Sequence, residues 1–190
     1  MPGILKPHRR LALMLAGALA AVLVWAWGAG LRFNPTPSLP LGLYRLADGL
    51  PQRGDAVSFC LSGAWAETAQ ERDYLKAGSC SHGLRPLLKL LAGLPGDRVT
   101  VGDNGISVTP AGSAVACLWP HTRIRTTDSH GRPVTSSLSG GRIPPGFALV
   151  LGTHPGSFDS RYFGLVPLAS LRRTVPLLVW NPNKDGNDED

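Results

Sequence analysis

Ser38 is the first residue whose type and surroundings could do chemistry. It lies in a stretch from Asn34 to Tyr44 with prolines at 35, 37 and 40, which restrict the backbone and favour an extended, non-helical conformation. Alternate side chains of an extended segment point the same way, so this stretch predicts that Thr36 and Ser38 share one face. A serine nucleophile needs donors for the oxyanion that forms on its substrate, and the Ser38 N–H and the Thr36 hydroxyl could supply them. The alternative is a proline-rich linker.

Lys89 is the second such residue, and it lies in an apolar run at 87–92. If the run is a strand, Lys89 shares one face with Leu87 and Leu91, and the other face is also leucine. Two apolar faces are typical of a strand buried on both sides. Burial disfavours the charged ammonium and lowers its pKa, and a general base that works near neutral pH needs such a shift. The alternative is a lysine at a strand edge that extends its amine to solvent.

A third polar group, at 157–161, follows an apolar run at 147–151. Taken alone, Asp159 and Arg161 predict a structural ion pair. A rival enzyme would use Ser38, His154 and Asp159 as a triad, although the sequence has no Gly-x-Ser-x-Gly elbow.

Together, in this order, the three stretches resemble the conserved boxes of the signal peptidase I superfamily. Asn-x-Thr-x-Ser-x-Pro-x-Gly-Leu-Tyr, from Asn34, is similar to the nucleophile box, and more narrowly to that of the TraF branch of conjugative-transfer peptidases, which process pilin precursors. Lys-x-x-x-x-Leu-Pro-Gly-Asp-x-Val, from Lys89, resembles the general-base box. Ser-x-Asp-Ser-Arg-Tyr-Phe-Gly, from Ser157, resembles the C-terminal box. The Gly-Asp-Asn found in general signal peptidases is replaced here by Gly-Thr-His at 152–154. Any support that the Gly-Asp-Asn element gives the site is therefore in doubt in this chain. The departure suits the TraF branch.

This resemblance implies roles for particular residues. Ser38 would be the nucleophile and Lys89 the general base, and the Ser38 N–H and the Thr36 hydroxyl would form the oxyanion hole. Ser157 would aim the lysine amine. Asp159 and Arg161 would brace the site, with Ser160 packed beside them.

The implied fold is mainly β: a signal-peptidase-like coiled antiparallel β-sheet domain with short helices, preceded by one N-terminal transmembrane helix. The implied function is a membrane-anchored serine endopeptidase that processes an exported precursor, a conjugative pilin subunit, by hydrolysis or with cyclisation. The alternatives are a general signal peptidase I and a non-catalytic membrane-anchored component of a conjugation or secretion apparatus. No cofactor and no metal are expected.

The N-terminal residues predict how these groups are positioned. A basic segment at 1–10 precedes an uncharged segment at 11–30 that is long enough to span a bilayer as a helix. The positive-inside rule then keeps the N-terminus cytoplasmic and exports the rest, which predicts a bacterial inner-membrane protein with a periplasmic domain at 31–180. Ser38 follows Gly30 by eight residues, which reach at most about 28 Å, so it should work close to the bilayer. The alternative is a cleaved secretory signal, since small-x-small sites occur within the segment.

Charge and cysteine content narrow the remaining options. The net charge of +6 comes from scattered basic residues without a nucleic-acid-binding pattern. A solvated surface or anionic lipid is therefore the expected partner for this charge, and nucleic acid is not. The spacing of Cys60, Cys80 and Cys117 does not predict zinc. One disulfide with one thiol left over is expected in an exported domain, with Cys60–Cys80 the favoured pair although the spacing does not decide it. The oligomeric state is open.

Periodicity predicts the other elements. Strands are expected at 42–46, 55–61, 98–101, 106–109 and 147–151, and helices at 64–76 and 167–172. Residues 110–145 should form short strands and loops, with a turn at 128–132 in which Asp128 and His130 are solvated. The acidic tail at 181–190 is expected to be disordered.

Overall fold

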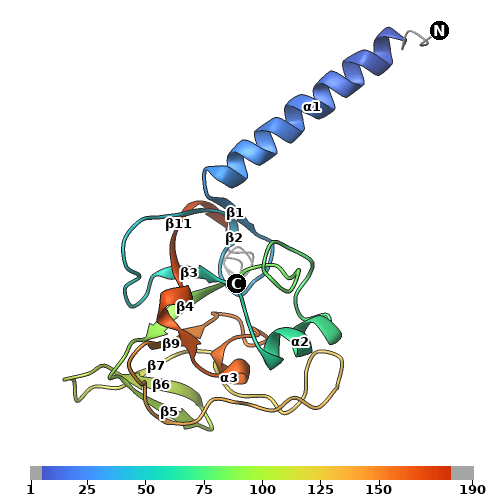
Figure 1. Ribbon diagram of the computed structural model, residues 1–190. Helices are drawn as coiled ribbons and strands as arrows, with labels where there is room; N and C mark the ends of the chain where they lie inside the picture. Colours follow the sequence, from blue (N-terminus) through green and yellow to red (C-terminus); the bar gives the residue numbers. More distant parts are fainter. Residues whose placement is uncertain (1–5, 181–190) are drawn as a thin grey trace, which may run out of the picture.

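An apolar helix leads into a β domain. The computed structural model describes residues 6–180, so the predicted acidic tail at 181–190 lies outside the described residues. Helix α1 spans Pro7–Gly28 and projects away from the domain (Figure 1), and none of its residues is buried. Its mean hydropathy reaches 2.1, so it is long and apolar enough to cross a membrane, a criterion that a secretory signal also meets.

The larger sheet holds the residues of interest. Its seven strands pair antiparallel throughout, in the order β1-β2-β11-β3-β4-β9-β10. Their bounds are Leu31–Asn34 for β1, Leu41–Leu46 for β2, Ala56–Phe59 for β3, Leu87–Gly93 for β4, Phe147–Leu151 for β9, Val166–Pro167 for β10 and Arg172–Trp180 for β11. Strand β4 pairs with β3 on one side and with β9 on the other. It is therefore a central strand, as its two apolar faces predict.

A four-stranded sheet lies at the end of the domain away from α1 (Figure 1), with the order β7-β6-β5-β8. Its strands are β5 (Arg98–Gly102), β6 (Gly105–Thr109), β7 (Cys117–Leu118) and β8 (Gly141–Arg142). Strand β9 separates two apolar cores: Ala148 and Val150 face the first, which includes α2 (Ala64–Glu71), and Leu149 and Leu151 face the second, which includes β5 and β6. The alternation of a strand accounts for this division.

The structure confirms the predicted mainly β, antiparallel fold with short helices and corrects two helices. Helix α2 ends at Glu71, not at residue 76, and Asp73 has a positive φ of 56° that a helix cannot continue. The helix predicted at 167–172 is wrong: a single 3₁₀ turn, η1 (Leu168–Ser170), leads into β11. The sequence did not predict β11, whose apolar run is interrupted by Pro176, a residue that argues against a strand away from a sheet edge or a bulge.

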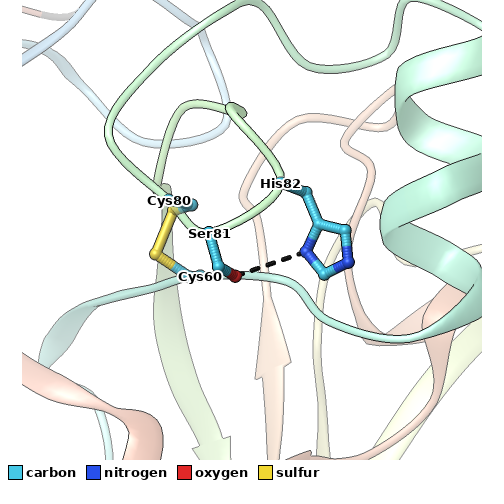
Figure 2. Close-up of a disulfide and its surroundings, with 4 residues drawn as sticks. All are labelled: Cys60, Cys80, Ser81 and His82. Carbon is cyan, nitrogen blue, oxygen red and sulfur yellow. Dashed lines mark hydrogen bonds between the residues drawn. A yellow bond between two sulfur atoms is a disulfide. The ribbon is translucent and has the colours of Figure 1, made fainter.

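A disulfide joins Cys60, just after β3, to Cys80 and confirms the favoured pairing (Figure 2). Cys80 lies in a loop that an isolated bridge between Ala77 and Leu84 closes into a hairpin. The Arg85 N–H also donates to the Lys76 carbonyl. This hairpin loop, residues 76–85, is therefore held at its base and tied to the sheet.

Candidate active site

Asn34 organises the loop that carries Ser38. Its side-chain amide donates to the carbonyls of Thr36, Leu39 and Pro40, at 3.0 to 3.2 Å, and its Oδ1 accepts from both the N–H and the hydroxyl of Thr36. The Tyr44 hydroxyl donates to the same Pro40 carbonyl. Strands β1 and β2 form a hairpin in which Asn34 pairs with Gly42, so Asn34 closes the connecting loop from the inside.

This loop corrects the predicted extended conformation. Residues Pro37 and Ser38 form a turn, in which Thr36 is exposed and Ser38 is buried, so the two side chains do not share a face. The prolines favoured an extended chain locally, but the three carbonyls gathered by Asn34 fold it back. The Thr36 hydroxyl donates to Asn34 Oδ1 at 3.0 Å and would have to rotate to reach an oxyanion.

Ser38 is held from the opposite side by the loop that follows β9. Its side chain is 8% exposed, and the Ser157 hydroxyl donates to Ser38 Oγ at 3.3 Å. The Ser38 carbonyl accepts from the Thr153 N–H at 2.8 Å and from the Thr153 hydroxyl at 3.2 Å. Thr153, part of the Gly-Thr-His departure, thus hydrogen-bonds directly to the backbone of Ser38.

Gly152 makes this approach possible. A Cβ at that position would lie 2.1 Å from Ser157 Oγ, closer than real Cβ contacts allow, and 3.1 Å from the Ser38 carbonyl oxygen, which is also tight. Its N–H donates to Asp159 Oδ2 at 2.9 Å. The glycine therefore allows Ser38, Ser157 and Asp159 to converge around one backbone position.

Lys89 lies in the middle of β4, paired with Val57 of β3, and only 3% of it is exposed. Leu87 and Leu91 on the same face are buried in the first core, as the alternation predicts. Burial lowers the pKa of the Lys89 amine from 10.5 to about 8; the Asp159 carboxylate opposes this shift and the Arg161 guanidinium adds to it. An amine with this pKa is partly neutral near pH 7, as a general base must be.

Lys89 and Thr36 line the same cavity, which has a volume of about 140 Å³. Within residues 6–180, no hydrogen bond joins the Lys89 amine to the Ser38 hydroxyl. Ser157, which the resemblance assigned to the lysine, instead donates to Ser38. Catalytic hydrogen bonds are often long before substrate binds. The missing bond therefore does not exclude Lys89 as the base and Ser38 as the nucleophile.

Asp159 and Arg161 form a fully buried ion pair at 2.8 Å. The Arg161 guanidinium also donates to the backbone carbonyls of His121, Arg123, His154, Pro155 and Ser157. A buried charge is tolerated when it is paired and fully hydrogen-bonded, as here. Arg161 thereby fastens the loop around His121 and the loop that carries Ser157 to each other. The predicted ion pair of Asp159 and Arg161 is present, and its contacts are with the backbone of the surrounding loops.

The remaining sequence candidates do not form a second catalytic group. Ser160 is buried and its hydroxyl accepts from the Val150 N–H at 3.0 Å. His154 Nδ1 accepts from the Gly156 N–H, whereas Asp159 faces Arg161, so within the described residues no hydrogen bond connects His154 with Asp159. This arrangement does not favour a Ser-His-Asp triad.

Asp128 corrects another expectation. The predicted turn at 128–132 is present, but the Asp128 side chain is only 7% exposed and is not solvated. It accepts from the Tyr74 hydroxyl at 2.7 Å and from Arg132 Nε at 2.7 Å. Asp128 thus fastens the turn to Tyr74, which lines the 140 Å³ cavity.

The sequence did not identify Asn34 or Thr153 as functional residues. Asn34 belonged to the first motif, and an asparagine before a Pro-rich turn is a signal for side-chain hydrogen bonds to nearby backbone. Nothing local to Thr153 predicted its contact, because its partner is more than a hundred residues away in the chain.

Comparison with known proteins identifies the family of the chain. Residues 8–180 match the family described as signal peptidase, peptidase S26. The chain therefore belongs to the signal peptidase S26 family, and it is a member of a peptidase family with an N-terminal helix suited to membrane anchoring.

The relatives narrow this class. A conjugal transfer protein TraF from Agrobacterium tumefaciens is 38% identical over 92% of this chain and 99% of its own length. A probable conjugal transfer protein TraF from Sinorhizobium fredii is 39% identical over 77% of this chain and 75% of its own. A plasmid transfer protein TraF from Escherichia coli is 33% identical over 89% and 90%, respectively. The chain is thus a signal peptidase S26 family protein similar to TraF conjugal transfer proteins.

Proposed function

We propose that this protein is a membrane-anchored serine endopeptidase in which Ser38 is the nucleophile and Lys89 the general base. One observation carries the proposal: a lysine in the middle of the sheet, with a pKa lowered to about 8, opens onto the same cavity as the loop that holds a buried serine. A buried cation without a carboxylate bonded to it is costly for the fold, so a function is the simplest reason for its presence.

In the proposed reaction the neutral Lys89 amine removes the Ser38 proton, and Ser38 Oγ attacks the scissile carbonyl. The Ser38 N–H and the Thr36 hydroxyl, after rotation away from Asn34, stabilise the oxyanion. Lys89 then protonates the leaving amine, and water or a second amine releases the acyl group from Ser38. Because no Lys89–Ser38 hydrogen bond is present among residues 6–180, peptide binding must bring the two side chains together.

The proposed substrate is an exported precursor, a conjugative pilin subunit. The similarity to TraF conjugal transfer proteins supports this assignment. The apolar helix α1 supports a single-pass inner-membrane protein with a cytoplasmic N-terminus and a periplasmic domain in contact with lipid.

Mass spectrometry of a candidate pilin precursor, incubated with the purified protein, tests the proposal. Wild type should shorten the precursor, Ser38→Ala and Lys89→Ala should not, and the exposed Ser139→Ala should act like wild type. Hydrolysis yields the linear product, and cyclisation yields a product lighter by one water. If activity survives in Lys89→Ala but not in His154→Ala, a histidine-based mechanism replaces the Ser/Lys pair.

A conjugation assay separates the peptidase from a non-catalytic scaffold. Ser38→Ala keeps the fold and the anchor, so it should abolish transfer only if catalysis is needed. Normal transfer by this variant would favour the scaffold. Cleavage of many unrelated signal peptides, with no preference for the pilin precursor, would favour a general signal peptidase.

A further inference from the structure

The cavity beside the proposed catalytic pair is lined by basic side chains. Arg32, Lys76, Arg85 and Lys89 lie around it, and among residues 6–180 no Asp or Glu does. The first three come from segments far apart in the sequence: β1 directly after the membrane helix, and the two ends of the hairpin loop at 76–85. Their convergence makes the cavity a site of positive potential.

Arg32 reinforces this field. One of its guanidinium nitrogens donates to the carbonyls of Trp27 and Leu31, neither of which neutralises its charge. Burial, and then the nearby Arg172 guanidinium, lower the pKa of Arg32, so its ionisable surroundings are cationic too. Arg32 therefore keeps its full charge beside the cavity. No carboxylate is among the groups that shift its pKa.

Lys76 and Arg85 are presented by a rigid base. The Arg85 N–H donates to the Lys76 carbonyl at 2.7 Å, and an isolated bridge joins Ala77 to Leu84. The Cys60–Cys80 disulfide, shown in Figure 2, ties the same loop to the end of β3. Lys76 pairs with Asp73, but both side chains are about two-thirds exposed, at 66% and 69%, so the pair is weak. Both cations are thus available to a ligand in the cavity.

We propose that this cavity recognises an acidic side chain of the peptide substrate, close to the scissile bond, through Arg85, Lys76 and Arg32. The charge of the lining favours a carboxylate, and the shared opening with Thr36 and Lys89 puts that carboxylate next to the reacting groups. An acidic residue there would also hold the substrate while Lys89 loses its proton, since the arginines keep the binding charge. The inference rests on the proposed function only in taking this cavity as the substrate's side of the site.

Peptide cleavage by the full chain in detergent micelles tests this specificity. The probes are short quenched peptides of Ala and Ser in which one position carries Glu, Gln or Lys and is moved along the peptide. At one or two positions, Glu should raise kcat/KM about fivefold over Gln, and Lys should lower it. Arg85→Glu and Lys76→Glu should each remove or reverse the preference, whereas Arg98→Glu, an exposed charge reversal on β5, should keep it.

Binding of the same peptides to Ser38→Ala, measured by fluorescence anisotropy, separates this inference from the proposed function. If wild type cleaves nothing, or if cleavage persists in Ser38→Ala, the proposed function fails, and a Glu preference in binding still supports the acidic site. Equal binding and cleavage of the Glu, Gln and Lys peptides overturns the inference alone. It is also overturned if Arg85→Glu slows all peptides equally and only in vesicles that contain anionic phosphatidylglycerol, because the cations then bind lipid.

Discussion

Lys89 combines two properties that conflict in most proteins, a cationic side chain and a place inside a sheet. Strand β4 is flanked on both sides, and Lys89 is 3% exposed. The free-energy cost of charging the amine appears as the lowered pKa of about 8. Two measurements follow from that single number.

The first measurement is the pH dependence of cleavage. Only the neutral amine can accept the Ser38 proton, so kcat/KM should rise about tenfold per pH unit and level off above about pH 8. Rates of peptide cleavage from acid to alkaline pH give the profile. An acid limb that persists in Lys89→Ala and disappears in His154→Ala would point to a histidine base instead.

The second measurement is stability. The folded pKa of about 8 is below the unfolded value of 10.5, so the unfolded state binds more protons between these values and stability rises with pH across that window. Below about pH 8 the full cost applies, about 3 kcal/mol for this shift. Lys89→Met should therefore be more stable than wild type at pH 7, by denaturant unfolding, and its advantage should shrink toward pH 10.5. An equal advantage at both pH values would mean that packing, not charge, is responsible.

Asn34 is a positioning residue in our interpretation. Asn34→Ala removes the contacts to three carbonyls and to Thr36, so we expect a loss of about 2 kcal/mol in stability and a fall in kcat larger than the change in KM. Asn34→Asp keeps the acceptor for Thr36 and loses the donors, which separates the two halves of the network. A variant that loses stability but keeps the wild-type kcat would show that Asn34 serves the fold alone.

At the scale of elements, two loops meet over Ser38. The β1–β2 loop carries the serine, and the loop after β9 holds it through Thr153 and Ser157. A third loop, at 76–85, forms a wall of the cavity. Each is fixed by a different device: a side-chain amide, a buried arginine and a disulfide, respectively.

The disulfide can be tested separately. Cys60 and Cys80 are 20 residues apart, and closing such a loop is worth about 3 kcal/mol. Cys60→Ser with Cys80→Ser should lower the melting temperature and loosen the loop that carries Lys76 and Arg85, so any Glu preference should weaken more than the cleavage of neutral peptides. Cys117→Ser, which changes the exposed thiol, is the matched control. No change in melting temperature on reduction would contradict this role.

At the scale of the whole molecule, the proposed site and the apolar helix α1 are close together in the chain. Strand β1 follows α1 almost directly and leads within a few residues to Ser38. Phe33 and Trp180, exposed on β1 and β11, have ring centroids 6.5 Å apart, and Trp180 pairs with Leu41, where β2 begins after the Ser38 loop. These exposed aromatic rings support the proposed location beside a bilayer.

Removal of residues 1–30 tests whether the anchor only locates the domain. No residue of α1 is buried, so the shortened protein should keep its fold and its cleavage of short peptides, and should no longer sediment with vesicles. Circular dichroism, peptide cleavage and vesicle sedimentation measure these three properties. An unfolded domain would show that α1 also contributes to folding.

The sequence by itself determined the features that depend on local order. The apolar N-terminal helix, the alternation in β4 and β9 and the motifs around Ser38 and Lys89 were all readable, because side-chain periodicity and turn chemistry act over a few residues. The motifs also indicated the family without any tertiary information.

Only the tertiary structure decided which distant groups touch. The insertion of β11 between β2 and β3, the contact of Thr153 with the Ser38 carbonyl and the convergence of Arg32 with Arg85 all join residues far apart in the chain. The fold-back of the Ser38 loop, by contrast, is local in origin: the prolines favour extension, but the Asn34 amide donates to carbonyls two, five and six residues further along the chain, and these bonds outweigh that preference. Contacts between residues far apart in the chain depend on how the whole chain folds. The local sequence around each residue therefore does not predict them.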